Sequence, residues 1–157
     1  MTELSAERMA RAALTMVGEP GDLRLTRLVH EVGGEEVWSG LRKQHLGDEI
    51  AGNLAARIAA ADPEAMLRGV GRQGIRFVIP GDEEWPDCLD DLDFCAPLHE
   101  RGGVPVGLWV RGNKRLSEVV DSSVSIVGSR SATTYGAEVT RQLALELAQE
   151  GYASVSG

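Results

Sequence analysis

The stretch that most restricts the fold is VSIVGSRSATTYGAEVTRQLALELAQEGYASVSG, from Val124 to Gly157. Its first five residues are a short apolar run that is typical of a buried strand, and YASVSG predicts a second strand. Between them, apolar residues recur at helical spacing from Tyr135 to Gln149, and Gly151 follows as a helix stop. Strand, glycine turn, helix and strand make a βαβ unit with two parallel neighbouring strands.

The carboxyl ends of the two predicted strands carry GSR and SG, and ligands of such sheets gather at these ends. A helix that starts there presents unpaired N–H groups and a partial positive charge, which favour a phosphate. Arg130 adds a planar guanidinium suited to phosphate oxygens, and the neighbouring hydroxyls add donors. We therefore predict an anion site, and its residues are Gly128, Ser129, Arg130, Ser131, Thr133, Ser156 and Gly157.

The motif differs from the common nucleotide-binding loops. No glycine lies between Gly128 and Gly136, so the dinucleotide fingerprint G-x-G-x-x-G is absent, and no G-K-[ST] follows. We expect no cofactor, no metal site and no catalytic residues, because no Ser-His-Asp set or metal-ligand spacing is visible. A plainer alternative stays open, in which Gly128 only makes a turn and Arg130 is solvated.

The net charge of −8 argues at first against a nucleic-acid partner. The acidity is local, however. Residues 81–100 contain eight Asp or Glu and no Lys or Arg, whereas residues 101–130 contain five Lys or Arg and two Asp or Glu. A basic surface around GSR is therefore compatible with the composition, and the acidic segment is expected to face solvent or a protein partner.

The first 74 residues predict short helices separated by glycines. Asp22 and Asp62 precede two of them as capping residues, and Pro63 takes the favoured first helical position. Ile50, Leu54, Ala55 and Ile58 suggest a further helix. The glycine turn at residues 30–37, HEVGGEEV, resembles the turn of DNA-binding helix pairs, but we interpret it as a plain connection because no basic residue adjoins it.

After Gly74 the sequence changes to strands at residues 75–79 and 107–112, with a short helix at PDCLDDL and a helix or turn at KRLSEVVDSS. Cys88 and Cys95 are interpreted as free thiols. No apolar run approaches the ~18 residues of a membrane span, and the charged N-terminus lacks a signal-peptide core. The expected location is the cytoplasm.

Three separated blocks, IPGDEEWPDCLDDL, PVGLWVRGN and the stretch from Val124 to Gly157, resemble the DNA-processing protein A family (DprA, also called Smf) in order and spacing. The resemblance implies an α+β chain. A small helical domain similar to a sterile alpha motif would occupy residues 1–74, and the first, truncated part of a Rossmann-like α/β domain with a parallel sheet would occupy residues 75–157.

The resemblance also implies a function. Family members bind single-stranded DNA, protect it during natural transformation and help load the RecA recombinase, and they are not enzymes. Their GSR arginine, here Arg130, belongs to a basic pocket for DNA phosphates. Members continue past SG with more strands, a pocket lysine and most dimer contacts. This chain is therefore expected to be an N-terminal part of such a protein, and a homodimer is expected to form through the C-terminal part.

Two rival functions follow from the same fold expectation. One is a nucleoside-monophosphate hydrolase that cleaves the N-glycosidic bond, which would need an acidic residue after Gly157. The other is a non-catalytic nucleotide sensor. The anion-binding interpretation of GSR does not by itself distinguish DNA from a nucleotide.

Overall fold

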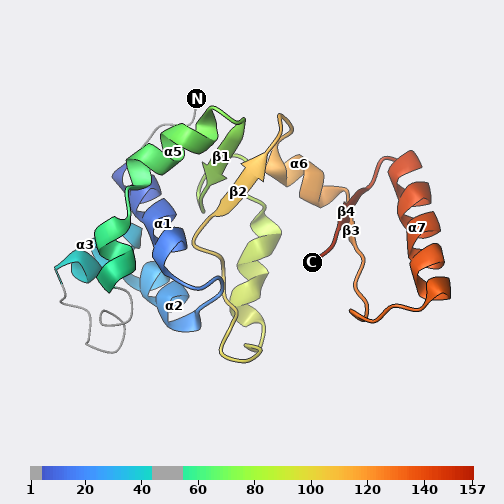
Figure 1. The fold of residues 1–157 in the computed structure, drawn as a ribbon, viewed down its shortest axis with the longest axis horizontal. Coiled ribbons are helices and arrows are strands. Elements are labelled where there is room, and N and C mark those ends of the chain that lie inside the picture. Colours follow the sequence, from blue (N-terminus) through green and yellow to red (C-terminus); the bar gives the residue numbers. More distant parts are fainter. Residues whose placement is uncertain (1–4, 44–54) are drawn as a thin grey trace. The chain divides into compact units, whose positions relative to one another are not determined.

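The computed structural model describes residues 5–43 and 55–157. The chain forms two compact units, Met1–Asn113 and Lys114–Gly157 (Figure 1). Helices and short strands are both present, and this confirms the predicted α+β class. No helix among the described residues is long and apolar enough to cross a membrane.

The helices of the first unit are α1 (Ala6–Val17), α2 (Leu23–Val32), α3 (Gly34–Arg42) and α5 (Pro63–Gly71), and residues 55–60 are also helical. The predicted caps are confirmed, because the Asp22 and Asp62 side chains accept hydrogen bonds from backbone N–H groups of the first helical turns. Of the further helix suggested by the sequence, Ala55 and Ile58 are helical, whereas Ile50 and Leu54 lie outside the described residues.

Helix α1 lies at the centre of this unit (Figure 1). Its side chains join apolar clusters on two sides. On one side Ala12 packs with Leu67 of α5 and with Phe77 and Ile79. On the other side Leu14 packs with residues of α2 and α3, namely Val29, Val37 and Leu41. The apolar side chains of α1 are therefore covered by α2 and α3 on one side and by α5 with Phe77 and Ile79 on the other.

Strands β1 (Ile75–Val78) and β2 (Leu108–Arg111) pair antiparallel, with Phe77 opposite Trp109. This pair lies in residues 75–157, where a parallel sheet was expected, and the antiparallel pairing of these two strands was not predicted. The two strands are joined by the 3-10 helix η1 (Asp87–Phe94) and a loop, and not by a packed α-helix that would return the chain to the same end of the sheet. Gly107 lets β2 approach β1, because a Cβ there would lie 2.2 Å from Phe77 Cζ.

The GDEEWP segment after β1 has a structural role in this unit. Asp82 accepts a 2.8 Å hydrogen bond from the Ile79 N–H, and it is paired with Arg8 of α1. Trp85 and Pro86 are buried behind this turn. The motif therefore ties the loop after β1 to α1, and the exposed Asp87, Asp90, Asp91 and Asp93 follow it in η1.

The turn between α2 and α3 consists of Gly33, whose φ of 85° favours glycine. Glu7 of α1 accepts hydrogen bonds from the Gly34 and Glu35 N–H groups at 2.9 and 2.8 Å. The N–H groups that could receive a phosphate at the start of α3 are thus occupied by a carboxylate. This supports the interpretation of residues 30–37 as a plain connection.

The second unit contains α6 (Leu116–Asp121), β3 (Ser123–Ser125), α7 (Thr134–Gln149) and β4 (Ala153–Val155). Strands β3 and β4 are parallel, with Val124 opposite Ser154, and the predicted βαβ arrangement is confirmed. The Ala153 N–H bonds Ser122 O and the Ile126 N–H bonds Val155 O, both at 2.8 Å, so the ladder extends one residue beyond each end of β3.

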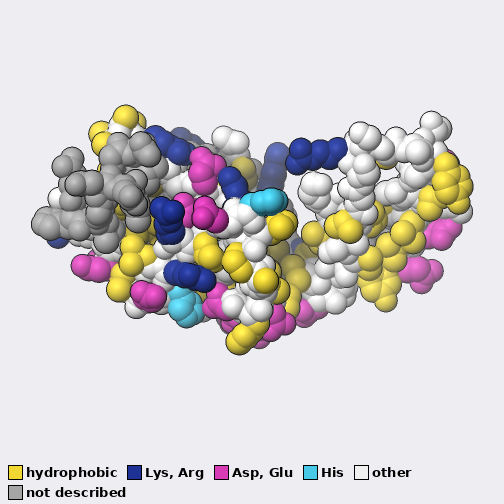
Figure 2. Space-filling model, turned by 90° about the horizontal axis from the view of Figure 1, so that it is seen from below, with side chains coloured by type: hydrophobic (Ala, Val, Ile, Leu, Met, Phe, Trp, Pro, Cys, Tyr) yellow, Lys and Arg dark blue, Asp and Glu magenta, His cyan; other side chains and the backbone are white. Residues whose placement is uncertain are grey.

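Apolar side chains of the second unit are widely exposed, and a broad group of them covers α7 in Figure 2. Val139, Leu143 and Leu145 of α7 are each about half exposed, and Val127 is 90% exposed. The expectation that VSIVG forms a buried strand is therefore wrong for the described unit, since β3 ends at Ser125 and only β4 pairs with it.

The two compact units divide after Asn113, whereas the sequence-based division falls after Gly74. The reason for the difference is packing, because Phe77 and Ile79 share a core with α1 and α5. The division at residue 74 matches the change from helices to strands along the chain, and as a domain boundary it stays a prediction.

Candidate nucleic-acid interface

The site forms where β3 and β4 end side by side. Residues 126–133 leave β3 and lead to α7, and Ser156–Gly157 leave β4 at the same edge. All seven predicted residues line one hollow there, with a volume of about 760 Å³. The parallel pairing thus brings Arg130 and Ser156 together, although α7 lies between them in the sequence.

The start of α7 is capped locally. Thr133 has an extended backbone, its Oγ1 accepts the Gly136 N–H at 3.1 Å, and its carbonyl accepts the Ala137 N–H. Ser129 Oγ accepts the Ser131 N–H at 3.1 Å. These hydroxyl oxygens therefore act as acceptors that shape the turn, while each hydroxyl hydrogen stays available to an anion.

Arg130 is an exposed cation of this hollow and forms no ion pair within the described part of the chain. Its neighbours in the lining are small, and the lining contains no Asp, Glu, His, Cys or Lys. A guanidinium beside hydroxyls and a helix start suits phosphate oxygens, because each group offers hydrogen-bond donors to an anion.

Gly128 differs from the expectation in its geometry. Its φ is not positive, and a Cβ built on it would meet nothing within 4 Å. A backbone conformation that favours glycine is therefore not the reason for a glycine at this position. Gly128 lines the hollow, and the space that a Cβ would enter is open. The glycine therefore allows a ligand to approach the backbone closely.

Two further residues of α7, Thr140 and Arg141, line the same hollow and were not anticipated. Thr140 Oγ1 donates to Gly136 O at 2.8 Å, one helical turn back. Arg141 is paired with Glu138. The i to i+7 spacing from Thr133 through Thr140 could have indicated a shared face of the helix, but the sequence offered no reason to place the strand ends beside it.

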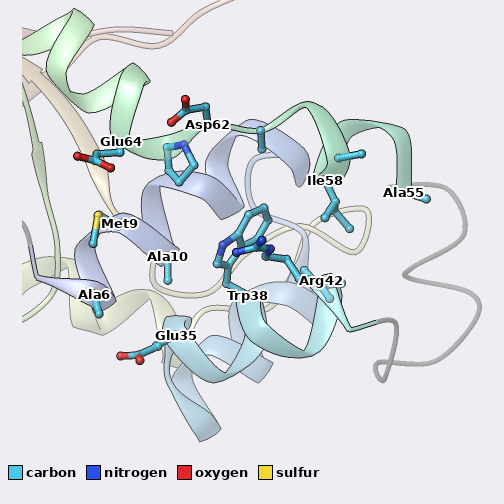
Figure 3. A pocket seen from close by; sticks show the side chains of 14 residues that line it. Ala6, Met9, Ala10, Glu35, Trp38, Arg42, Ala55, Ile58, Asp62 and Glu64 are labelled. Carbon is cyan, nitrogen blue, oxygen red and sulfur yellow. The ribbon is translucent and has the colours of Figure 1, made fainter.

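A second hollow, of about 710 Å³, lies in the first unit between α1, α3 and residues 55–64 (Figure 3). Met9, Trp38 and Ile58 contribute apolar side chains to its lining. Its charged lining residues are Arg42 and three carboxylates, Glu35, Asp62 and Glu64. The excess of negative charge makes it unsuited to a phosphate, so the strand-end hollow is the better candidate.

The two cysteines are not in the lining of the strand-end hollow. Cys88 and Cys95 are free and exposed, as predicted. They lie at opposite ends of η1, whose ~2 Å rise per residue separates them too far for a disulfide. In the described ranges no group of three or more His, Cys, Asp or Glu could hold a metal ion.

A parallel strand-helix-strand unit with a cationic, hydroxyl-lined hollow at its strand ends is the arrangement that the sequence predicted for an anion site in an α/β unit. The family model for DNA recombination-mediator protein A matches residues 76–157, just over half of the chain. The chain therefore belongs to this family, whose members are DNA-processing proteins, and the resemblance noted in the sequence is confirmed.

Two curated relatives, from two strains of Mycobacterium tuberculosis, bear the name DNA processing protein DprA. Each is 37% identical over 154 residues, which cover 94% of this chain and 39% of the relative. The chain thus spans about two fifths of the length of these relatives. No solved structure matches the chain significantly.

Proposed function

We propose that this protein binds single-stranded DNA through the phosphate backbone, protects it during natural transformation and helps load the RecA recombinase. Membership of a recombination-mediator family supports a DNA partner. The observation that carries the proposal is the strand-end hollow, where Arg130 stands exposed among Ser129, Thr133 and Ser156 with no ion pair in the described chain.

The proposed action is binding and not catalysis. The hollow's lining offers serine and threonine hydroxyls but no His, Asp, Glu or Cys that could serve as base, acid or activated nucleophile. Phosphate contacts carry no sequence information, so binding is expected to be similar for different base sequences. A homodimer also stays a prediction.

The test is Arg130→Ala in the full-length gene product, with labelled oligo-dT and fluorescence anisotropy across a salt series. The loss of one charge-assisted contact of roughly 1.5–3 kcal/mol corresponds to about ten- to a hundredfold weaker binding. The log-log salt slope should fall in magnitude by about 0.7. Arg130→Lys should recover part of the affinity, since a point charge replaces a planar fork.

Arg68→Ala is the matched control, because it removes the same charge from the exposed face of α5, where Arg68 pairs with Glu64. Equal affinity for folded Arg130→Ala and Arg68→Ala variants would mean that Arg130 is merely solvated. The assembly of RecA on oligo-dT in the presence of the protein should decrease in parallel with DNA affinity for the Arg130 variants.

The same preparation distinguishes the rival functions. A nucleotide sensor would bind dTMP as tightly as oligo-dT, and an N-glycosidic hydrolase would release free base from a nucleoside monophosphate. Either result would replace the DNA-binding proposal.

A further inference from the structure

The hollow contains a second guanidinium, from a different element than the first. Arg130 lies in the loop after β3, whereas Arg141 lies in the second turn of α7. The two are separated by ten residues of loop and helix, and the fold turns both toward the hollow together with Ser156. The two guanidinium groups differ in their pairing. Arg130 has no ion pair within the described residues, whereas Arg141 forms one.

The partner of Arg141 is Glu138, one turn closer to the helix start. Arg141 Nη2 lies 2.6 Å from Glu138 Oε1, and Arg141 Nε lies 3.1 Å from Glu138 Oε2. Helical side chains lean toward the N-terminus, so the pair holds the guanidinium on the side of the helix start. The guanidinium thus already meets two oxygens in the fork geometry that a phosphate also offers.

The pair is easily exchanged, because its two side chains are 66% and 61% exposed. Exposed ion pairs contribute little to stability, since water competes for both charges. A backbone phosphodiester carries one negative charge, as the Glu138 carboxylate does, so one that enters the hollow would replace this carboxylate on Arg141 at small cost.

The position of Arg141 along α7 bears on how many phosphates the hollow can hold. Its Cα is eight residues beyond the cap Thr133, which is about 12 Å along the helix axis. When its side chain leans back by one turn of ~5.4 Å, the guanidinium lies about 7 Å along the axis from Thr133, which is beyond the Thr134 and Tyr135 N–H groups at the helix start. The Arg141 guanidinium therefore offers a phosphate a position further along α7 than the one at the helix start, with room for a second phosphate of the same strand.

We propose that Arg141 is a second phosphate-binding residue and that the hollow holds two phosphates of one DNA strand. Without DNA, the ion pair with Glu138 holds the Arg141 guanidinium in place. This deepens the proposed function and rests on it. The ligand class is then an oligonucleotide backbone, and a single nucleotide fills only the Arg130 half of the hollow.

The experiment compares Arg141→Ala, Glu138→Gln and the double variant in the full-length gene product, with Arg68→Ala as control. Arg141→Ala should weaken oligo-dT binding by roughly three- to tenfold, since the contact is exposed. It should also lower the salt slope in magnitude by about 0.7 and leave dTMP binding unchanged. Arg130→Ala should weaken both ligands, and Glu138→Gln should tighten oligo-dT binding by roughly two- to threefold.

The double variant distinguishes two reasons for weaker binding by Arg141→Ala. One is the loss of an Arg141–phosphate contact, and the other is repulsion of DNA by the Glu138 carboxylate once its partner is gone. If Arg141 touches phosphate, the double variant binds oligo-dT more weakly than Glu138→Gln alone. Equal affinity of these two would mean that Arg141→Ala acts only by exposing Glu138, and this would overturn the inference. An equal loss of dTMP and oligo-dT affinity in Arg141→Ala would overturn the two-phosphate arrangement.

The Arg68→Ala control also distinguishes failure of the Arg141 inference from failure of the proposed DNA-binding function. If Arg141→Ala behaves like Arg68→Ala while Arg130→Ala still weakens binding, the inference fails and the proposed function stands. If Arg130→Ala also behaves like Arg68→Ala, both fail.

Discussion

Arg8 of α1 and Asp82 of the loop after β1 form a two-armed ion pair, with both N–O distances at 2.7 Å. Arg8 also donates to Phe77 O at 2.8 Å, and Asp82 accepts the Ile79 N–H at 2.8 Å. Their side chains are 8% and 18% exposed. One arginine therefore ties the first helix both to β1 and to the acidic segment that follows it.

Breaking this pair should destabilise the first unit strongly. Arg8→Met leaves the Asp82 carboxylate without its main partner, and a lost buried pair costs about 3 kcal/mol where one member is partly exposed. Urea unfolding of the 157-residue chain measures the effect. Arg68→Met, which breaks an exposed pair with Glu64, should change the free energy of unfolding by no more than about 0.5 kcal/mol. Similar losses for both variants would contradict the structural role of Arg8.

Acid should weaken the same unit through Asp82 and Glu7. Burial by itself raises the pKa of each carboxyl, but hydrogen bonds outweigh it and both pKa values are lowered. The bonds come from Arg8 and the Ile79 N–H for Asp82, and from Gly34, Arg11 and Glu35 for Glu7.

Because the folded pKa values lie below the unfolded ones of about 4, the stabilisation is complete above that pH and is lost as the pH falls through the folded values. Urea midpoints between pH 7 and pH 3 test this. The decrease below pH 5 should be smaller in Asp82→Asn than in the unaltered chain. An identical pH profile would show that Asp82 does not contribute to it.

Two glycine-to-alanine changes should have opposite effects. Gly107→Ala places a Cβ 2.2 Å from the Phe77 ring and should destabilise by about 1–3 kcal/mol, as overpacking does. Gly128→Ala meets nothing within 4 Å and should leave the melting temperature unchanged. If DNA approaches the backbone of Gly128, this variant should nevertheless bind oligo-dT more weakly. Unchanged binding would mean that this glycine is not needed for a ligand.

The acidic segment should not contact DNA. Replacing Asp90, Asp91 and Asp93 by Asn removes three exposed charges. The Asn at position 90 keeps a side-chain oxygen that can accept the hydrogen bond that Asp90 accepts from Trp85 Nε1–H. Carboxylates repel phosphates at close range, and screening limits the effect beyond about 10 Å at 0.1 M salt. Oligo-dT affinity at moderate salt should therefore stay within a few-fold. A hundredfold gain would place this segment beside the bound strand.

Much of the local structure follows from short-range rules that the sequence displays. Asp22 and Asp62 cap helices because a carboxylate accepts the N–H groups two or three residues later. The parallel pairing of β3 and β4 follows from a strand, a turn, an amphipathic helix and a strand in close succession, since such a unit closes in only one way. The same succession predicted that GSR and SG would meet.

Tertiary structure decided what depends on contacts between distant residues. The pairing of Arg8 with Asp82, the capping of α3 by Glu7 and the antiparallel register of β1 and β2 carry no periodic signal in the sequence. The place of Arg141 in the hollow was also hidden, because a helix pattern marks which residues share a face but not what that face adjoins. Periodicity and capping are local energies, whereas these contacts form only once the elements have packed.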